Sequence, residues 1–208
     1  MTVSIEQYLN TSCHPDREFV DGLIVERNLG ERTHSVAQRE VIVYFAARSA
    51  EYGIEVFPGV RVQVSPTRIR VPDVTVIKSS QCQGEIFTAP PHLCIEILSK
   101  DDTMVHMQEK IDDCLRFGIP HIWIINARLR KGYVATKAGM VKAESGVLET
   151  SDPEIRVPVT ELFDNDQGHV LIADSEQGGG PGISAVRVRP TVGGMLKTRY
   201  GSSNSRFG

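Results

Sequence analysis

Apolar and polar residues follow each other along this chain with the periods of both helices and strands, which predicts a mixed α/β fold. A short helix is expected over residues 5–9, with Ser4 as its N-cap. In residues 17–26, two short apolar stretches flank Asp21-Gly22, a dipeptide that favours tight β-turns. This pattern predicts a β-hairpin near the start of the chain.

Residues 33–52 predict the first long helix, because their apolar positions recur every three or four residues. Thr33 is the expected cap and Gly53 the expected end. An apolar run inside this segment would also fit a buried strand. Farther along, residues 54–64 and 69–78 alternate like strands on either side of a proline turn, so the two are expected to pair antiparallel.

A strand, a helix and a second strand follow in the order that defines a βαβ unit. The first strand is the apolar run of residues 93–98, and the helix begins near residues 101–103 and ends at Gly118. Residues 121–126 form the next expected strand, and residues 130–135 form one more. Because a crossover helix joins parallel strands, the strands before and after it are expected to be parallel neighbours.

The character of the chain changes after Phe163, where glycine-rich segments replace the apolar pattern. We expect one domain over residues 1–173 and a disordered tail over residues 174–208, because the tail has too few apolar residues to build a packed face. Basic residues in the tail could contact phosphates, although a solvated extension without that role fits them better.

Composition restricts the functional classes. With 208 residues, of which 40% are hydrophobic, the chain can bury a single core. Its net charge of -3 means that contact with nucleic acid requires a local basic surface. The four cysteines lack the spacing of a zinc site or a disulfide framework, which favours reduced thiols. No signal peptide or apolar run of about 20 residues occurs, so a cytoplasmic protein without membrane contact is expected.

Two acidic residues, Asp73 and Glu96, occupy positions at which strands should be apolar. A buried carboxylate is costly unless a cation or hydrogen-bond donors surround it. Side chains alternate along a strand, so Asp73 shares a face with Val71 and Thr75, and Glu96 shares one with Cys94. If the two strands are neighbours, both carboxylates can bind one divalent ion, for which Mg2+ is suited and Mn2+ is an alternative.

The same residues resemble those of the PD-(D/E)xK nuclease superfamily, and more closely those of the Uma2-type restriction endonuclease family. The resemblance is carried by Val71-Pro72-Asp73-Val74, Glu96-Ile97-Leu98-Ser99, Lys110, Gly118-Ile119-Pro120, Trp123-Ile124-Ile125, Glu18-Phe19-Val20-Asp21-Gly22 and His34. It extends to about Phe163. The resemblance implies an α/β restriction-endonuclease-like core, in which helices flank a mixed central sheet and a β-hairpin precedes it.

One position departs from the superfamily pattern. The lysine expected two residues after the glutamate is Leu98. Uma2-type proteins are similar to this chain in that respect, and the resemblance places the lysine on the following helix, at Lys110. Lys110 lies at the edge of the apolar stripe of that helix, from which its long side chain can reach a sheet edge. A solvated helix flank is the alternative environment for this side chain.

The site candidates also have structural alternatives. Glu18 projects from the hairpin and could add a third carboxylate near the ion, whereas Asp21 fits the needs of the turn. His34 could act as a general base or contact a phosphate, or stand at the helix start without a role. Glu96 could be one half of a structural ion pair, and Asp73 could cap a strand end.

These expectations define three functional hypotheses. The first is a Mg2+-dependent DNA endonuclease in which Asp73 and Glu96 bind the metal and Lys110 stabilises charge at the scissile phosphate. Cutting both strands of a duplex favours a homodimer. The second is a catalytically inactive module of the same fold that binds nucleic acid or protein, and the third is an enzyme acting on a small phosphate ester. Signatures of serine hydrolases, P-loop NTPases, dinucleotide-binding proteins and zinc proteases do not occur.

Overall fold

The computed structural model describes residues 2–11, 17–27, 31–81, 83–100 and 102–163. The chain divides into two units, Met1–Val170 and Leu171–Gly208, and every described residue belongs to the first. The predicted tail, residues 174–208, therefore lies outside the described residues.

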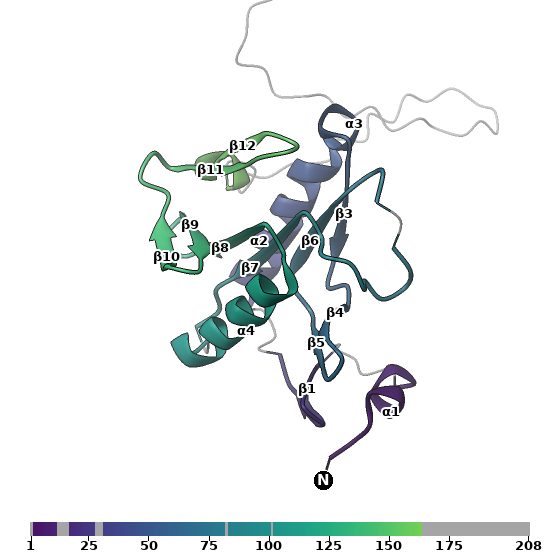
Figure 1. Cartoon of the computed structure of the whole chain (residues 1–208). Coiled ribbons are helices and arrows are strands. Elements are labelled where there is room, and N and C mark those ends of the chain that lie inside the picture. Colours follow the sequence, from purple (N-terminus) through teal and green to yellow (C-terminus); the bar gives the residue numbers. More distant parts are fainter. Residues whose placement is uncertain (1, 12–16, 28–30, 82, 101, 164–208) are drawn as a thin grey trace, which may run out of the picture. The chain divides into compact units, whose positions relative to one another are not determined.

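The described residues contain four α-helices, one short 3-10 helix and twelve strands (Figure 1). The helices are α1 (Ile5–Leu9), α2 (Arg32–Ala46), α3 (Ser49–Tyr52), α4 (Met104–Phe117) and the 3-10 helix η1 (Val159–Leu162). The strands are β1 (Glu18–Val20), β2 (Leu23–Val25), β3 (Ile54–Pro58), β4 (Val62–Ser65), β5 (Arg68–Arg70), β6 (Val74–Lys78), β7 (Leu93–Ile97), β8 (His121–Asn126), β9 (Lys131–Thr136), β10 (Gly139–Lys142), β11 (Val147–Thr150) and β12 (Ile155–Pro158).

The central sheet has six strands in the order β10-β9-β8-β7-β6-β3. β7 and β8 are parallel neighbours connected by α4, as the βαβ pattern predicts. The other neighbouring pairs of this sheet are antiparallel. The sheet is mixed because α4 carries the chain back over the sheet before β8 begins, which is the connection that parallel strands need.

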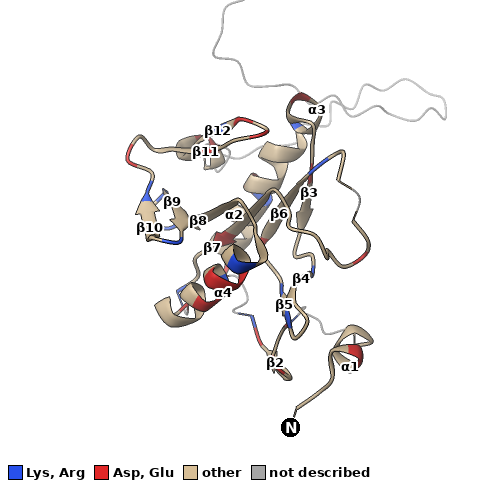
Figure 2. Ribbon diagram, in the orientation of Figure 1, with Lys and Arg blue, Asp and Glu red and all other residues tan. Residues whose placement is uncertain are grey.

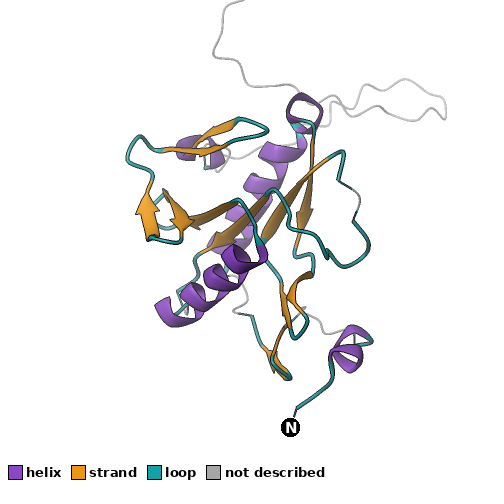
Figure 3. Ribbon diagram, viewed as in Figure 1, coloured by secondary structure: helices purple, strands orange, loops and turns teal. Residues whose placement is uncertain are grey.

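Helices cover both faces of this sheet (Figure 1, Figure 3). α2 contributes Val41 and Phe45 to a buried cluster with Trp123, and α4 contributes Ile111 to a second cluster with Ile124. The consecutive residues Trp123 and Ile124 belong to different clusters because side chains alternate along a strand. The predicted fold class, α/β with a mixed central sheet flanked by helices, is confirmed.

A second sheet has the order β2-β1-β5-β4 and contains the predicted N-terminal hairpin. Asp21 and Gly22 form its turn with φ values of 49° and 90°, both in the left-handed region that glycine and aspartate tolerate. A Cβ at Gly22 would lie 3.3 Å from the Cβ of Thr2, so the turn also has little room for a side chain. β1 pairs with β5, which brings the hairpin beside the segment that precedes Asp73.

Two predicted strands are each divided in two. Residues 54–64 form β3 and β4, and residues 69–78 form β5 and β6. The first break follows Pro58 at Gly59, which has a left-handed φ of 55°, and the second includes Pro72, which has no N–H for a strand ladder. The expected antiparallel pairing forms, but β3 pairs with β6 in the central sheet and β4 with β5 in the smaller one.

The helix predicted over residues 33–52 is divided as well. α2 ends at Ala46, and α3 ends before Gly53, which has a left-handed φ of 63°. Glu31 rather than Thr33 occupies the N-cap position of α2, and its side chain makes no capping hydrogen bond. The carboxylate of Glu31 binds two basic side chains instead.

Within the described ranges, no helix combines the length and apolar character that a bilayer crossing requires. Cys94 and Cys114 are buried free thiols. The remaining two cysteines, Cys13 and Cys82, lie outside the described residues.

Candidate active site

Asp73 immediately precedes β6, and Glu96 lies on the adjoining strand β7. β6 and β7 pair with Val74 opposite Ile95, so the residue before Val74 faces the residue after Ile95. The backbone N–H of Ile97 donates to Asp73 Oδ2 at 2.8 Å, which holds the Asp73 carboxylate against β7. Both acids are buried, with exposed fractions of 6% and 5%. The structure thus contains the strand pairing on which the predicted acidic pair depends.

The Asp73 carboxylate also contacts two cationic or protonatable side chains. Arg27 Nη2 donates to Oδ1 at 2.6 Å, and His34 Nε2 lies 3.1 Å from Oδ2. Burial opposes ionisation of Asp73, but the hydrogen bond from His34 and the charge of Lys110 outweigh it, so the pKa is lowered. Burial likewise opposes charging of His34, and the contact with Asp73 outweighs it and raises the pKa of the imidazole.

Glu96 has one paired and one unpaired oxygen. Oε2 accepts a hydrogen bond from Lys110 Nζ at 2.7 Å. Oε1 is buried and has no hydrogen-bond partner among the described residues. Burial raises the pKa of Glu96 to about 7, and the charge of Lys110 only partly offsets it. A cation that enters the site therefore meets a carboxylate oxygen that no donor of the described residues occupies.

Lys110 reaches this carboxylate from α4. Its position at the edge of the apolar stripe of the helix allows this contact. Its Nζ lies 3.0 Å from Glu18 Oε1 and donates to the carbonyl oxygen of Val71 at 3.2 Å. Burial would lower the pKa of Lys110, but the charges of Glu18 and Glu96 outweigh burial and raise it. Lys110 therefore keeps its proton at neutral pH and cannot act as a general base there.

Glu18 has protein partners on both oxygens. Oε1 accepts from the Val71 N–H at 3.0 Å in addition to Lys110, and Oε2 accepts from Arg70 Nη1 at 2.8 Å. Burial opposes ionisation of Glu18, but Lys110 and Arg70 outweigh it and lower its pKa. Lys110 consequently bridges Glu18 and Glu96, and in these contacts Glu18 holds the lysine rather than meeting an ion directly.

Sequence patterns did not identify Arg27 and Arg70, which line the site, or Asp113, which pairs with Arg70. Arg70 on β5 donates to Asp113 Oδ2 on α4 through Nε at 2.8 Å and Nη2 at 2.6 Å (Figure 2 shows the basic residues of β5 and the acidic residues of α4). An acid inside the buried part of α4 is a signal that could have identified Asp113. Arg27 and Arg70 carry no such local signal, since their acidic partners lie 43 to 52 residues away in the chain.

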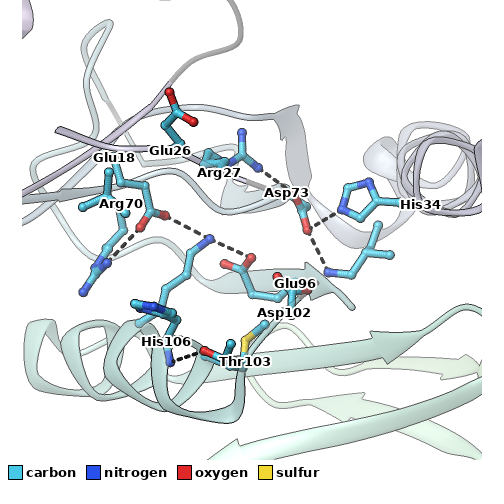
Figure 4. A pocket seen from close by; sticks show the side chains of 14 residues that line it. Glu18, Glu26, Arg27, His34, Arg70, Asp73, Glu96, Asp102, Thr103 and His106 are labelled. Carbon is cyan, nitrogen blue, oxygen red and sulfur yellow. Dashed lines mark hydrogen bonds and ion pairs between the residues drawn. The ribbon is translucent and has the colours of Figure 1, made fainter. Parts of the chain in front are cut away.

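Arg27 and Arg70 line a cavity of about 310 Å³ together with Glu18, Asp73, Glu96 and Lys110 (Figure 4). Glu96 lies between Glu18 and Asp73 in Figure 4, and His106 reaches the cavity from α4. The lining includes five carboxyl groups and three lysine or arginine side chains. A net negative cavity of this kind attracts cations.

The oxygen donors of this cavity fit a hard divalent cation. Among residues placed by the structure, no three His, Cys, Asp or Glu side chains gather as a metal-binding group. Mg2+ does not require such a group, because it keeps several waters and is commonly bound by one or two carboxylates together with substrate phosphates. Asp73 and Glu96 are the two residues that would hold it, and within the described part of the chain no donor reaches Glu96 Oε1.

The fold is that of a nuclease-like α/β protein. A crystal structure described as "a putative nuclease belonging to DUF820" from Anabaena variabilis matches with a TM-score of 0.65 and 20% sequence identity, covering 77% of this chain and 97% of that chain. At this identity the likeness concerns the fold alone.

Sequence comparison gives the family. The profile of the Uma2 family, described as "Putative restriction endonuclease", matches residues 5–164. The chain belongs to the Uma2 family, as its motifs predict. Families of this kind generally use divalent metal ions, and membership supports a nuclease function. No curated protein matches the chain.

Proposed function

We propose that this protein is a Mg2+-dependent endonuclease that hydrolyses phosphodiester bonds in DNA through a PD-(D/E)xK-like site with a relocated lysine. Family membership supports the nuclease function. One observation carries the finer proposal: Asp73, just before β6, accepts from the N–H of Ile97 on β7, next to Glu96, and the Lys110 ammonium lies 2.7 Å from Glu96. Mn2+ would substitute for Mg2+, since both accept carboxylate oxygens.

Each residue has a separate task in this proposal. Asp73 and Glu96 would hold the ion, which would supply positive charge for the phosphate and make an attacking water easier to deprotonate. Lys110 orients Glu96 and adds fixed positive charge near the scissile phosphate. His34 orients Asp73 through their 3.1 Å contact, and Glu18 holds Lys110. Neither His34 nor Glu18 needs to meet the ion for these tasks.

The assembly and location of the enzyme are part of the same proposal. A homodimer would place two sites on one duplex, which double-strand cleavage requires. The nuclease domain would span residues 1–173, without a contribution from residues 174–208. Two buried free thiols, Cys94 and Cys114, are compatible with a reducing, cytoplasmic environment.

Nicking of supercoiled plasmid DNA tests the proposal. The wild-type protein should convert the plasmid to nicked and linear forms with Mg2+ or Mn2+, and not with EDTA. Glu96→Gln keeps the shape of the side chain but removes the ligand charge, so the rate should fall by at least about 100-fold. Glu149→Gln is the matched control, because Glu149 pairs with Arg156 outside the cavity and the rate should not change.

Two outcomes would overturn the proposal. An intact plasmid in the presence of either ion, with the wild-type protein folded, would exclude the endonuclease. Faster hydrolysis of a free nucleotide than of plasmid would instead identify an enzyme of small phosphate esters.

A catalytically inactive nuclease-fold module is the second candidate. The observation in its favour is that Arg27, His34 and the Ile97 N–H already bind both oxygens of Asp73. Such a module would not be stabilised by metal, whereas a folded metal binder must be stabilised once the ion exceeds its dissociation constant. A thermal midpoint that does not rise with Mg2+ or Mn2+ would therefore favour the module.

A further inference from the structure

Two of the three cations that line the active-site cavity are fully committed to protein acids. Lys110 pairs with both Glu18 and Glu96, and Arg70 pairs with both Glu18 and Asp113. Their side chains are 12% and 4% exposed. Neither can turn toward a substrate without leaving a buried carboxylate unpaired, which is strongly unfavourable.

Arg27 differs from these two cations. Within the described part of the chain, it contacts one acid, Asp73, through one nitrogen, Nη2. Its side chain is 18% exposed and lines the same cavity. Its other guanidinium N–H groups therefore remain able to donate to an anion, in the forked geometry that suits phosphate.

The contact of Arg27 involves the atom of Asp73 that an ion would need. Oδ2 of Asp73 is held by the Ile97 N–H and lies 3.1 Å from His34 Nε2, whereas Oδ1 accepts from Arg27 alone among the described residues. A divalent ion and a guanidinium on the same oxygen repel each other. Binding of the ion therefore favours departure of Arg27 from Asp73.

The charges of the cavity also favour a released Arg27 that binds the substrate. When all five carboxyl groups are ionised and the lining histidines are neutral, the three lysine and arginine side chains leave a net charge of about -2, which one divalent ion balances. A phosphodiester then adds one further negative charge. Arg27, once released from Asp73, is the cation of the described lining that is free to neutralise it.

We propose that Arg27 is a substrate-binding residue that exchanges partners, from Asp73 Oδ1 in the metal-free protein to a non-bridging oxygen of the substrate phosphodiester once the ion is bound. This inference rests on the proposed endonuclease function. It assigns opposite effects to one side chain: Arg27 competes with the metal and assists the nucleic acid.

The Arg27→Gln variant tests both effects. Its affinity for Mn2+ alone, measured by calorimetry, should be at least about threefold higher than that of the wild type, because the competing charge is gone. Its affinity for a short DNA duplex, measured by fluorescence anisotropy with Ca2+ as the ion, should be about tenfold lower. The slope of log affinity against log salt concentration should decrease in magnitude by about one.

Controls separate these effects from damage to the fold. Arg156→Gln also removes an arginine and an ion pair, but outside the cavity, and should change neither affinity. Arg27→Lys keeps the charge without the forked geometry, so it should retain the wild-type salt slope with weaker DNA binding. It carries the test if Arg27→Gln does not fold.

Weaker Mn2+ binding by Arg27→Gln would overturn the inference, because a merely structural arginine lowers both affinities. Unchanged DNA affinity and salt slope would also overturn it. In either case the wild-type protein still nicks plasmid, which leaves the endonuclease proposal standing. A wild-type protein that neither binds Mn2+ nor nicks plasmid overturns the proposed function itself.

Discussion

Glu96 is the residue at which burial most directly affects protonation and cation binding. Its carboxyl group is buried beside one ammonium group, and one of its oxygens has no donor among the described residues. Burial raises its pKa to about 7, so protons and cations compete for this group within the physiological pH range.

Metal affinity should therefore depend steeply on pH. Because the ion binds the ionised carboxylate, each unit of pH below about 7 should weaken Mn2+ binding by close to tenfold through Glu96, and binding should level off above about pH 8. Calorimetric titrations at a series of pH values measure this dependence. An affinity that is constant across the series would contradict the assignment of Glu96 as a ligand.

Glu96 should also reduce the stability of the metal-free protein. Its pKa is higher in the folded state than the usual 4.5, so the folded state retains a proton that the unfolded state releases, and stability falls as pH rises from about 4.5 to about 7. Glu96→Gln removes this effect and should increase the free energy of unfolding by about 1–3 kcal/mol at pH 8, with no such gain at pH 4.5. Urea denaturation without metal at both pH values is the measurement, and a less stable variant at pH 8 would refute the prediction.

At the level of elements, buried ion pairs connect three segments that are distant in sequence. Arg70 on β5 binds Glu18 on β1 and Asp113 on α4, and all three residues are buried. Lys110 lies one turn before Asp113 on the same helix. The position of the lysine thus depends on contacts that also hold α4 against the smaller sheet.

Arg70→Gln should destabilise the protein by about 3–5 kcal/mol, because it leaves two buried carboxylates without their shared partner. Arg68→Gln is the matched comparison: Arg68 also binds Asp113, but its side chain is 23% exposed and its other partners are exposed acids, so about 1 kcal/mol is expected. Urea denaturation of both variants gives the two values. Equal losses would show that the buried pairs contribute no more than the exposed ones.

The elements with local signals could be predicted from sequence. α4 begins at the Thr103 cap, whose hydroxyl accepts from the His106 N–H, and ends at Gly118 with a left-handed φ of 97°. The division of the long strands could not be predicted, because it depends on which partner strand each half pairs with. Pro58, Gly59 and Pro72 permit a break without specifying the sheet that each half joins.

The residues of the candidate site also differ in how far sequence patterns could identify them. Alternation along two strands predicted that Asp73 and Glu96 lie on one face if the strands are neighbours, whereas Lys110 required the family resemblance. Arg27 was missed, since its contact with Asp73 spans 46 residues and no spacing rule connects them.

At the level of the whole molecule, both the chain and its cavity carry net negative charge. The net charge of -3 gives DNA no general attraction, and the cavity itself has more acids than bases. Under the proposed function, the ion would have to bind before the substrate, because it would convert a repulsive cavity into one that accepts phosphate.

A chain truncated after residue 173 should fold and bind metal like the full-length protein. The buried clusters of the described residues extend to Phe163 and lie within the unit Met1–Val170. The thermal midpoint should change by less than about 2 °C, and the Mn2+ affinity should not change. Scanning calorimetry with and without Mn2+ checks both, and a clear loss of either would show that residues 174–208 contribute to the domain.

Leu98, at the position where the superfamily pattern has lysine, packs beside the apolar cluster of α4, while the amine comes from Lys110, 14 residues after Glu96. A contact between an acid and an amine therefore does not require a fixed sequence motif. An ammonium group can approach the same acid from the strand or from the helix that follows it. If the proposed function holds, genome searches that demand a fixed interval between glutamate and lysine would overlook this chain, and searches by three-dimensional template would recover it.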